Sequence, residues 1–143
     1  DGSMLRAPSP LMVWNSFLPA TQYYIITLYA PAASNYSLNI IVPARLNFAS
    51  GSNTTSYTGP IAQPDTVEFL ARGNAGQTMT VTLTSAGNDV LLTIYGLDDG
   101  QPLVRYVSGA TSWTGTLPGS QDYVIEARAT GSSTSFTVTV TIH

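Results

Sequence analysis

The sequence predicts an all-β protein: an antiparallel β-sandwich, jelly-roll-like, preceded by a three-strand fragment of another repeat of the same domain. Apolar and polar residues alternate through most of the chain, which is the period-2 pattern of half-buried strands. Clusters of Gly, Pro, Asn, Asp and Ser interrupt the alternation at short intervals, and no stretch shows a sustained helical period. One phrase near the N-terminus also recurs near the C-terminus.

Two segments show the strand pattern most clearly. Thr78–Thr84 reads TMTVTLT and Phe136–Ile142 reads FTVTVTI, so each places apolar side chains on one face and threonines on the other. The inward residues are expected to be Met79, Val81, Leu83, Phe136, Val138, Val140 and Ile142. Turn signals fall at residues 50–53, 72–77, 85–89, 97–102, 117–122 and 130–135. We expect about eight or nine short antiparallel strands between Leu46 and Ile142, folded as a sandwich.

The repeated phrase is VWNSFLPATQYYIITL at Val13–Leu28 and SWTGTLPGSQDYVIEA at Ser112–Ala127. The match continues into the last strand, where Val42 aligns with Ile142. The distance between the two copies is the size of one β-sandwich. We therefore expect residues 1–10 to be an expression remnant or linker, residues 11–43 to be the last strands of an upstream repeat, and residues 45–143 to be one complete sandwich.

The repeated phrase also predicts structural roles for four aromatic residues. The pattern Leu-Pro-x-x-Gln-x-Tyr before an alternating strand is typical of a tyrosine corner, in which the hydroxyl bonds back to upstream backbone. Tyr123 and Tyr24 are expected to form such corners. Trp113 and Trp14 occupy equivalent positions, and we expect both to pack in a core and not against a ligand.

A longer stretch resembles a known family. Two runs carry the resemblance: VEFLARGNAGQTMTVTLTSAGNDVLLTIYGLDDGQPL at Val67–Leu103 and, further along the chain, YVIEARATGSSTSFTVTVTI. Together they resemble the bacterial pre-peptidase C-terminal (PPC-like) domain family. The matching motifs are the AGQT turn, the strand between Asp89 and the DDG turn, and the final hairpin that begins with a tyrosine. The resemblance implies a β-sandwich carried as a non-catalytic, often tandem, accessory domain of secreted or cell-surface bacterial proteins. It therefore implies an extracellular or cell-surface location.

The composition argues against several classes of function. The net charge is −3, lysine is absent and the arginines are scattered, so no stripe for nucleic acid is expected. No apolar run approaches the ~18 residues of a membrane span, so we expect no membrane insertion. Cysteine is absent and His143 is the only histidine, which leaves no residues for Ser/His/Asp catalysis or for a zinc site. We expect neither an enzyme nor a resident cofactor.

Calcium is the one metal for which the sequence offers ligands. Asp98 and Asp99 precede Gly100, and Asp89 would contribute from across the sheet. Calcium takes about six to eight oxygens, so backbone carbonyls would have to supply most of them. The alternative is a hairpin turn between Val90–Leu97 and Pro102–Val107, for which Asp-Gly is a strong signal. We prefer the turn, and the PPC-like family's denser acidic cluster is reduced here to Asn88-Asp89.

The N-terminal strand YYIITLYA carries the remaining functional signal. Its alternation leaves Tyr23 and Tyr29 on an outer face, where the second copy has Asp122 and Arg128. An exposed aromatic face indicates contact with a partner. One interpretation is a carbohydrate-binding module in which tyrosines stack on polysaccharide or envelope glycan; the residues are Tyr23, Tyr29, Tyr106 and Tyr57. The alternative is a structural spacer in a tandem array, whose aromatic face packs against neighbouring copies of the domain or forms a homodimer through the N-terminal strands.

Overall fold

The computed structural model describes residues 4–5, 18 and 20–143. The chain divides into two compact units, Asp1–Leu38 and Asn39–His143. Every strand assigned in the described residues belongs to the second unit: β1 (Ala44–Arg45), β2 (Thr54–Pro60), β3 (Thr66–Gly73), β4 (Thr78–Ser85), β5 (Val90–Gly96), β6 (Pro102–Val104), β7 (Ser112–Thr116), β8 (Gln121–Ala129) and β9 (Ser135–Ile142). A short 3-10 turn, η1 (Tyr106–Ser108), lies between β6 and β7. Within the described ranges, no helix is long and apolar enough to cross a membrane.

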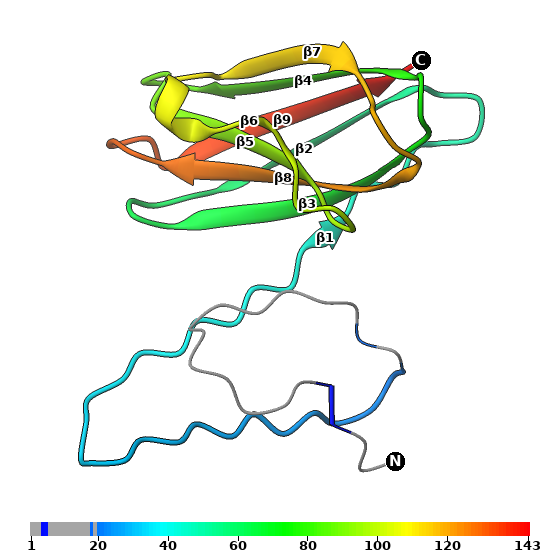
Figure 1. Cartoon of the computed structure of the whole chain (residues 1–143). Coiled ribbons are helices and arrows are strands. Elements are labelled where there is room, and N and C mark those ends of the chain that lie inside the picture. Colours follow the sequence, from blue (N-terminus) through cyan, green and yellow to red (C-terminus); the bar gives the residue numbers. More distant parts are fainter. Residues whose placement is uncertain (1–3, 6–17, 19) are drawn as a thin grey trace. The chain divides into compact units, whose positions relative to one another are not determined.

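The strands form two sheets that face each other (Figure 1). The five-stranded sheet has the order β1-β3-β8-β5-β6, and the four-stranded sheet has the order β2-β9-β4-β7. All pairings are antiparallel except that of the short β1, which runs parallel to β3. The prediction of an antiparallel β-sandwich is confirmed, and the expected hairpin around the DDG turn is present as β5 and β6.

The core lies between the sheets and follows the period-2 pattern of the strands. In β4, Met79, Val81 and Leu83 are buried, while the threonines between them face outward. β9 shows the same alternation from Phe136 to Ile142. Trp113 in β7 is partly buried and packs against this core. The alternation in the sequence therefore identifies the inner faces correctly.

Three aromatic rings connect the two sheets. Phe69 of β3 lies 5.0 Å, centroid to centroid, from Tyr57 of β2 and 6.2 Å from Phe136 of β9. Tyr57 and Phe136 are 6.0 Å apart, and all three pairs are tilted. Tilted rings at such distances attract one another beyond simple burial. Tyr57, a candidate sugar-stacking residue from the sequence, thus packs its ring against two buried core residues, although it stays 39% exposed.

A tyrosine corner precedes β8. The Tyr123 hydroxyl donates to the Gly119 carbonyl at 2.7 Å and accepts from the Gly119 N–H at 3.2 Å. In the first unit, the Tyr24 hydroxyl donates to the Ala20 carbonyl at 2.6 Å and accepts from the Ala20 N–H at 3.2 Å. The aligned copies of the phrase therefore share one local hydrogen-bond pattern. Trp14 lies outside the described residues.

We expect Tyr123→Phe to lower the free energy of unfolding by about 1–2 kcal/mol. The ring is fully buried, and without its hydroxyl both polar groups of Gly119 lose their partner. Urea denaturation measures the effect as a lower midpoint at an unchanged m-value. Tyr36→Phe is the control, because this ring is 77% exposed. Equal midpoints for the two variants would contradict a structural role for the corner.

The segment 20–43 has no assigned strand, and most of its side chains are exposed. Tyr23 is 101% exposed and Tyr29 is 88% exposed. The expected three-strand fragment of an upstream repeat at residues 11–43 therefore stays a prediction, as do the bounds of the other expected segments.

Candidate functional site

The most prominent feature of the sandwich surface is the loop that carries η1. This η1 loop, residues 105–109, joins β6 at the edge of the five-stranded sheet to β7 at the edge of the four-stranded sheet. Val107 at its tip is 74% exposed, the highest value for a large hydrophobic residue between Ala44 and His143. Arg105, Ser108 and Gly109 are exposed as well. The loop therefore presents one apolar and one cationic side chain to solvent.

Hydrogen bonds within the η1 loop fix its conformation. The Arg105 carbonyl accepts from the Ser108 hydroxyl at 2.8 Å and from the Ser108 N–H at 3.0 Å. Gly109 adopts the left-handed conformation, with φ of 72°, and its N–H donates to the Tyr106 carbonyl at 2.9 Å. This position favours glycine, because a residue with a Cβ adopts a positive φ only at an energetic cost.

Contacts with the five-stranded sheet anchor the base of the loop. The Tyr106 N–H donates to the Thr93 hydroxyl of β5 at 3.1 Å. The guanidinium of Arg128, from β8, lies 4.7 Å from the centroid of the Tyr106 ring, within the range of a cation–π contact. Arg105 lies outside this arrangement: the one ion pair in the described part of the chain joins Arg45 and Asp122. Arg105 is exposed and forms no ion pair with a described residue.

An acidic pair lies on the outer face of the same sheet. Glu68 of β3 and Glu126 of β8 are cross-strand partners, and Thr93 of β5 is the next partner of Glu126. Burial, followed by repulsion from Glu126, raises the pKa of Glu68 above its ordinary value. Burial also raises the pKa of Glu126, although hydrogen bonds from Thr93 and Tyr95 oppose the change. The pKa of Tyr95 is strongly raised by burial and then by the two carboxylates.

We expect Glu68→Gln to stabilise the fold by about 0.5 kcal/mol at pH 7, the typical cost of like charges directly opposite each other. A carboxyl group with a raised folded-state pKa favours folding at low pH, and this contribution is lost as the pH rises through the folded pKa. The gain from the substitution should therefore shrink as the pH falls through the ordinary glutamate pKa of ~4.3, because Glu68 then becomes protonated in both states.

Urea midpoints across this pH range measure the effect of Glu68→Gln. Glu126→Gln is the matched comparison, and its gain should be smaller because Glu126 accepts hydrogen bonds from Thr93 and Tyr95. A gain from Glu68→Gln that stays constant down to pH 3 would argue against this electrostatic origin.

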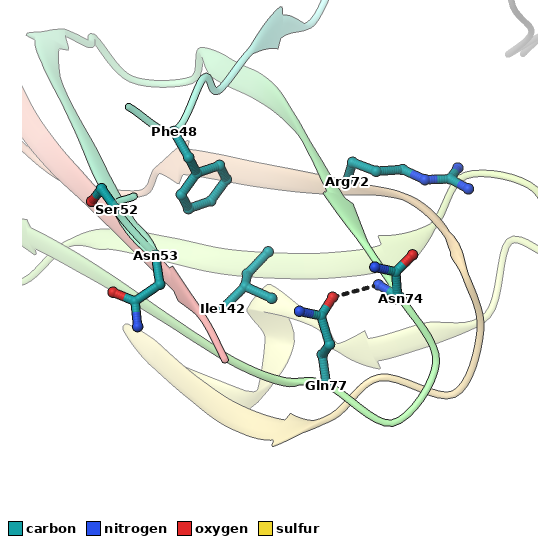
Figure 2. Close-up of a pocket in the computed structure, with 7 residues that line it drawn as sticks. All are labelled: Phe48, Ser52, Asn53, Arg72, Asn74, Gln77 and Ile142. Atoms are coloured by element: carbon teal, nitrogen blue, oxygen red, sulfur yellow. Dashed lines mark hydrogen bonds between the residues drawn. The ribbon is translucent and has the colours of Figure 1, made fainter. Parts of the chain in front are cut away.

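A shallow groove lies at the opposite end of β4 from the η1 loop (Figure 2). Phe48 and Ile142 supply its apolar surface, and the other lining residues are polar: Ser52, Asn53, Arg72, Asn74 and Gln77. The side-chain amide oxygen Oε1 of Gln77 accepts from the Asn74 backbone N–H at 2.8 Å, as the dashed line in Figure 2 shows. The groove has a volume of about 260 Å³, which is below the ~300–1,000 Å³ of ordinary small-molecule sites. The groove is therefore a weaker candidate than the loop.

The three carboxylates named as calcium ligands are not brought together. Asp89 precedes β5, whereas Asp98 and Asp99 follow its other end. Asp89 accepts from the Ser133 N–H at 3.0 Å, and hydrogen bonds from Ser133 lower its pKa. The Asp99 carboxylate accepts from the Gln101 N–H and the Gln121 side chain, which lowers its pKa. Among the described residues, no group of three His, Cys, Asp or Glu side chains is arranged to hold a metal.

Two of the four candidate sugar-stacking tyrosines, Tyr57 and Tyr106, lie in the sandwich. Tyr57 packs against the core, and the Tyr106 ring contacts Arg128. Tyr23 and Tyr29 belong to the other unit, and the described residues around them, 20–38, carry no assigned strand. Sequence reasoning missed Arg105 and Val107, which lie between two predicted strands in the run LVRYVSGA. The Ser-Gly pair at 108–109 was the only local signal of a turn there.

Comparison with solved structures finds proteins of similar fold. The chain is similar to Aeromonas hydrophila PliG, a periplasmic inhibitor of g-type lysozyme, with a TM-score of 0.61 and 24% identity over 72% of this chain and 97% of that one. It is also similar to Salmonella Typhimurium PliG (TM-score 0.55, 21% identity, 71% and 97% coverage) and to an Escherichia coli PliG mutant (0.54, 20%, 71% and 97%). No protein-family model and no curated protein matches the chain.

These comparisons overturn the resemblance to the pre-peptidase C-terminal family, because the similar solved structures are lysozyme inhibitors. The shared motifs are turns and alternating strands, which any antiparallel sandwich requires, and so they do not discriminate between families. The interpretations as a carbohydrate-binding module and as a tandem-array spacer are likewise wrong. The partners expected from those interpretations are wrong for the same reason, because the similar proteins are named for inhibiting a protein, g-type lysozyme. Those expected partners were polysaccharide or envelope glycan, neighbouring copies of the domain, and a second copy in a homodimer.

Proposed function

We propose that this protein is a non-catalytic inhibitor of a g-type lysozyme and acts in the bacterial cell envelope. The observation that carries the proposal is the fold: the match to this chain covers 97% of the length of each of three inhibitors of g-type lysozyme. Their periplasmic location supports the envelope as the site of action. The inhibitor binds the enzyme as a protein partner and changes no covalent bond.

The η1 loop is the element that we assign to the enzyme's cleft. Glycoside hydrolases carry catalytic carboxyl groups inside a substrate cleft, so an inhibitor gains affinity from a cation placed there. Arg105 supplies the cation and Val107 supplies an apolar contact beside it. With both side chains in the cleft, the glycan substrate is excluded by overlap.

The rigidity of the loop favours this role. The bonds of Ser108 and Gly109 close the turn, and Thr93 and Arg128 hold its base. A loop that is ordered before binding loses less conformational entropy on association, so more of the contact energy appears as affinity. Inhibitor complexes with such pre-organised surfaces change little in backbone conformation on binding.

The test is a lysis assay with a purified g-type lysozyme and a suspension of bacterial cell walls. We expect increasing amounts of the protein to slow the loss of turbidity until lysis stops. A c-type lysozyme is the matched control, and its activity should be unaffected. Undiminished g-type activity at a large molar excess of the protein would refute the proposal.

A further inference from the structure

The outer face of the four-stranded sheet consists almost entirely of hydroxyl side chains. Every outward position of β2, β4, β7 and β9 is threonine or serine, except Pro60 at the end of β2. We call this set the hydroxyl face: Thr54, Ser56, Thr58, Thr78, Thr80, Thr82, Thr84, Ser112, Thr114, Thr116, Ser135, Thr137, Thr139 and Thr141. The outer face of the other sheet, in contrast, carries Glu68, Glu126 and Arg128. The hydroxyl face therefore differs from ordinary charged protein surface.

The strand register places these hydroxyls in rows across the sheet. One row runs from Thr54 through Thr141 and Thr80 to Thr114. The next row runs from Ser56 through Thr139 and Thr82 to Ser112, and a third contains Thr58, Thr137 and Thr84. The hydroxyl face is thus a two-dimensional array, with one hydroxyl at each crossing of a strand and a row.

Hydrogen bonds between neighbouring side chains order this array. The hydroxyl oxygens of Thr54 and Thr141 are 2.9 Å apart, and those of Ser56 and Thr139 are also 2.9 Å apart. The Thr58–Thr137 and Thr80–Thr114 pairs are separated by 2.8 and 3.1 Å. Threonine is also stiff at χ1 because it is β-branched. Its hydroxyl and methyl groups are therefore held at repeating positions in the unbound protein.

The spacing of the array follows from sheet geometry. Rows along one strand are ~6.6–6.8 Å apart, and neighbouring strands are ~4.7–4.9 Å apart. Both values are close to the repeats of water oxygens on a prism face of hexagonal ice. A charge-free array of fixed hydroxyls and methyls orders water at those repeats, whereas charged side chains impose their own hydration. We propose that the hydroxyl face binds ice crystals.

The twist of the sheet limits the area of the match. Adjacent strands of a sheet rotate by roughly 20–25°, so registry with a flat lattice is best at the centre and is lost toward the rim. Thr82 and Thr139 lie at that centre, on adjacent strands of the middle row. A small matched area favours adsorption that slows the regrowth of ice grains over a large depression of the freezing point. This inference is independent of lysozyme inhibition, which uses the η1 loop.

The test is ice-affinity capture. A polycrystalline ice shell is grown slowly from a dilute solution of the protein, and the protein concentrations in the ice and in the remaining liquid are compared. We expect the wild-type protein to be enriched in the ice and Thr82→Lys to lose that enrichment. Ala86→Lys places the same charge on an exposed turn beyond β4 and should be enriched like the wild type. Exclusion of the wild type from the ice to the same extent as Thr82→Lys would overturn the proposal.

A second variant guards against loss of folding as the cause. Thr139→Lys alters the neighbouring strand of the same row and should also lose enrichment. Circular dichroism and the urea midpoint of each variant show whether it is folded. If folded Thr82→Lys and Thr139→Lys are both enriched like the wild type, the hydroxyl face is not the binding surface and the proposal fails.

Discussion

Val107→Asp is expected to weaken inhibition of g-type lysozyme by about thirtyfold or more. We assign Val107 as a hot spot of the interface; such residues contribute about 2 kcal/mol or more, and each ~1.4 kcal/mol corresponds to a factor of ten in the dissociation constant. The substitution also places a negative charge where we expect the carboxyl groups of the enzyme's cleft. Because Val107 is 74% exposed, the stability of the free protein should change little. The inhibition constant from lysis rates measures the effect.

Thr116→Asp is the matched control for Val107→Asp. It introduces the same charge at an exposed position at the end of β7, away from the η1 loop, and should inhibit like the wild type. Arg105→Glu should weaken inhibition in the same way as Val107→Asp, because it replaces the cation of the loop with an anion. If the wild type inhibits and both loop variants inhibit equally well, the protein is an inhibitor that uses another surface. If the wild type does not inhibit, the functional proposal itself is wrong.

The sandwich could be predicted from the sequence because its strands have one face in the core and one in water. TMTVTLT and FTVTVTI alternate without a break, and both are strands with the expected faces. The outer face of β8 follows the pattern less simply. Val124 and Asp122 point outward by alternation, yet both are buried. Their neighbours on adjacent strands bury them: Leu70 and Tyr95 beside Val124, and Arg45 beside Asp122. Such pairing between strands cannot be derived from the periodicity within one strand.

The candidate site could not be predicted because its signal is tertiary. Arg105 and Val107 are ordinary residues in the sequence, and the structure distinguishes them by exposure on a loop that Thr93 and Arg128 hold from other strands. The tyrosines were candidate binding residues because exposed aromatic rings can stack on sugars. Tyr57 packs against the core in a way that its strand context alone did not reveal, because the partner ring of Phe69 comes from the opposite sheet. Residue type alone therefore led to a wrong function.

The second large effect is expected for Arg45→Met, which should destabilise the fold by about 2 kcal/mol at pH 7. The Arg45 guanidinium donates to both oxygens of Asp122, at 2.9 and 2.8 Å. The Asp122 side chain is only 9% exposed, so the substitution leaves a buried carboxylate without its cation. The loss should be smaller than the ~3–5 kcal/mol of a fully buried pair, since the Arg45 side chain is 45% exposed.

Acid should narrow the difference between Arg45→Met and the wild type. The hydrogen bonds from Arg45 hold the pKa of Asp122 below its ordinary value in the folded wild type. A lowered folded-state pKa contributes stability above the unfolded pKa of ~3.9, and this contribution is lost as the pH falls through the folded pKa. In the variant the hydrogen bonds from Arg45 are absent, so protonation of Asp122 at low pH removes the cost of a buried charge without its partner. The urea midpoints of Arg45→Met and the wild type should therefore converge from pH 7 to pH 3.

Arg72→Met is the control for Arg45→Met. Arg72 acts on Asp122 only as a more distant charge, so the loss of stability should stay below ~1 kcal/mol. Equal losses for Arg45→Met and Arg72→Met would show that the bidentate pair has no special role.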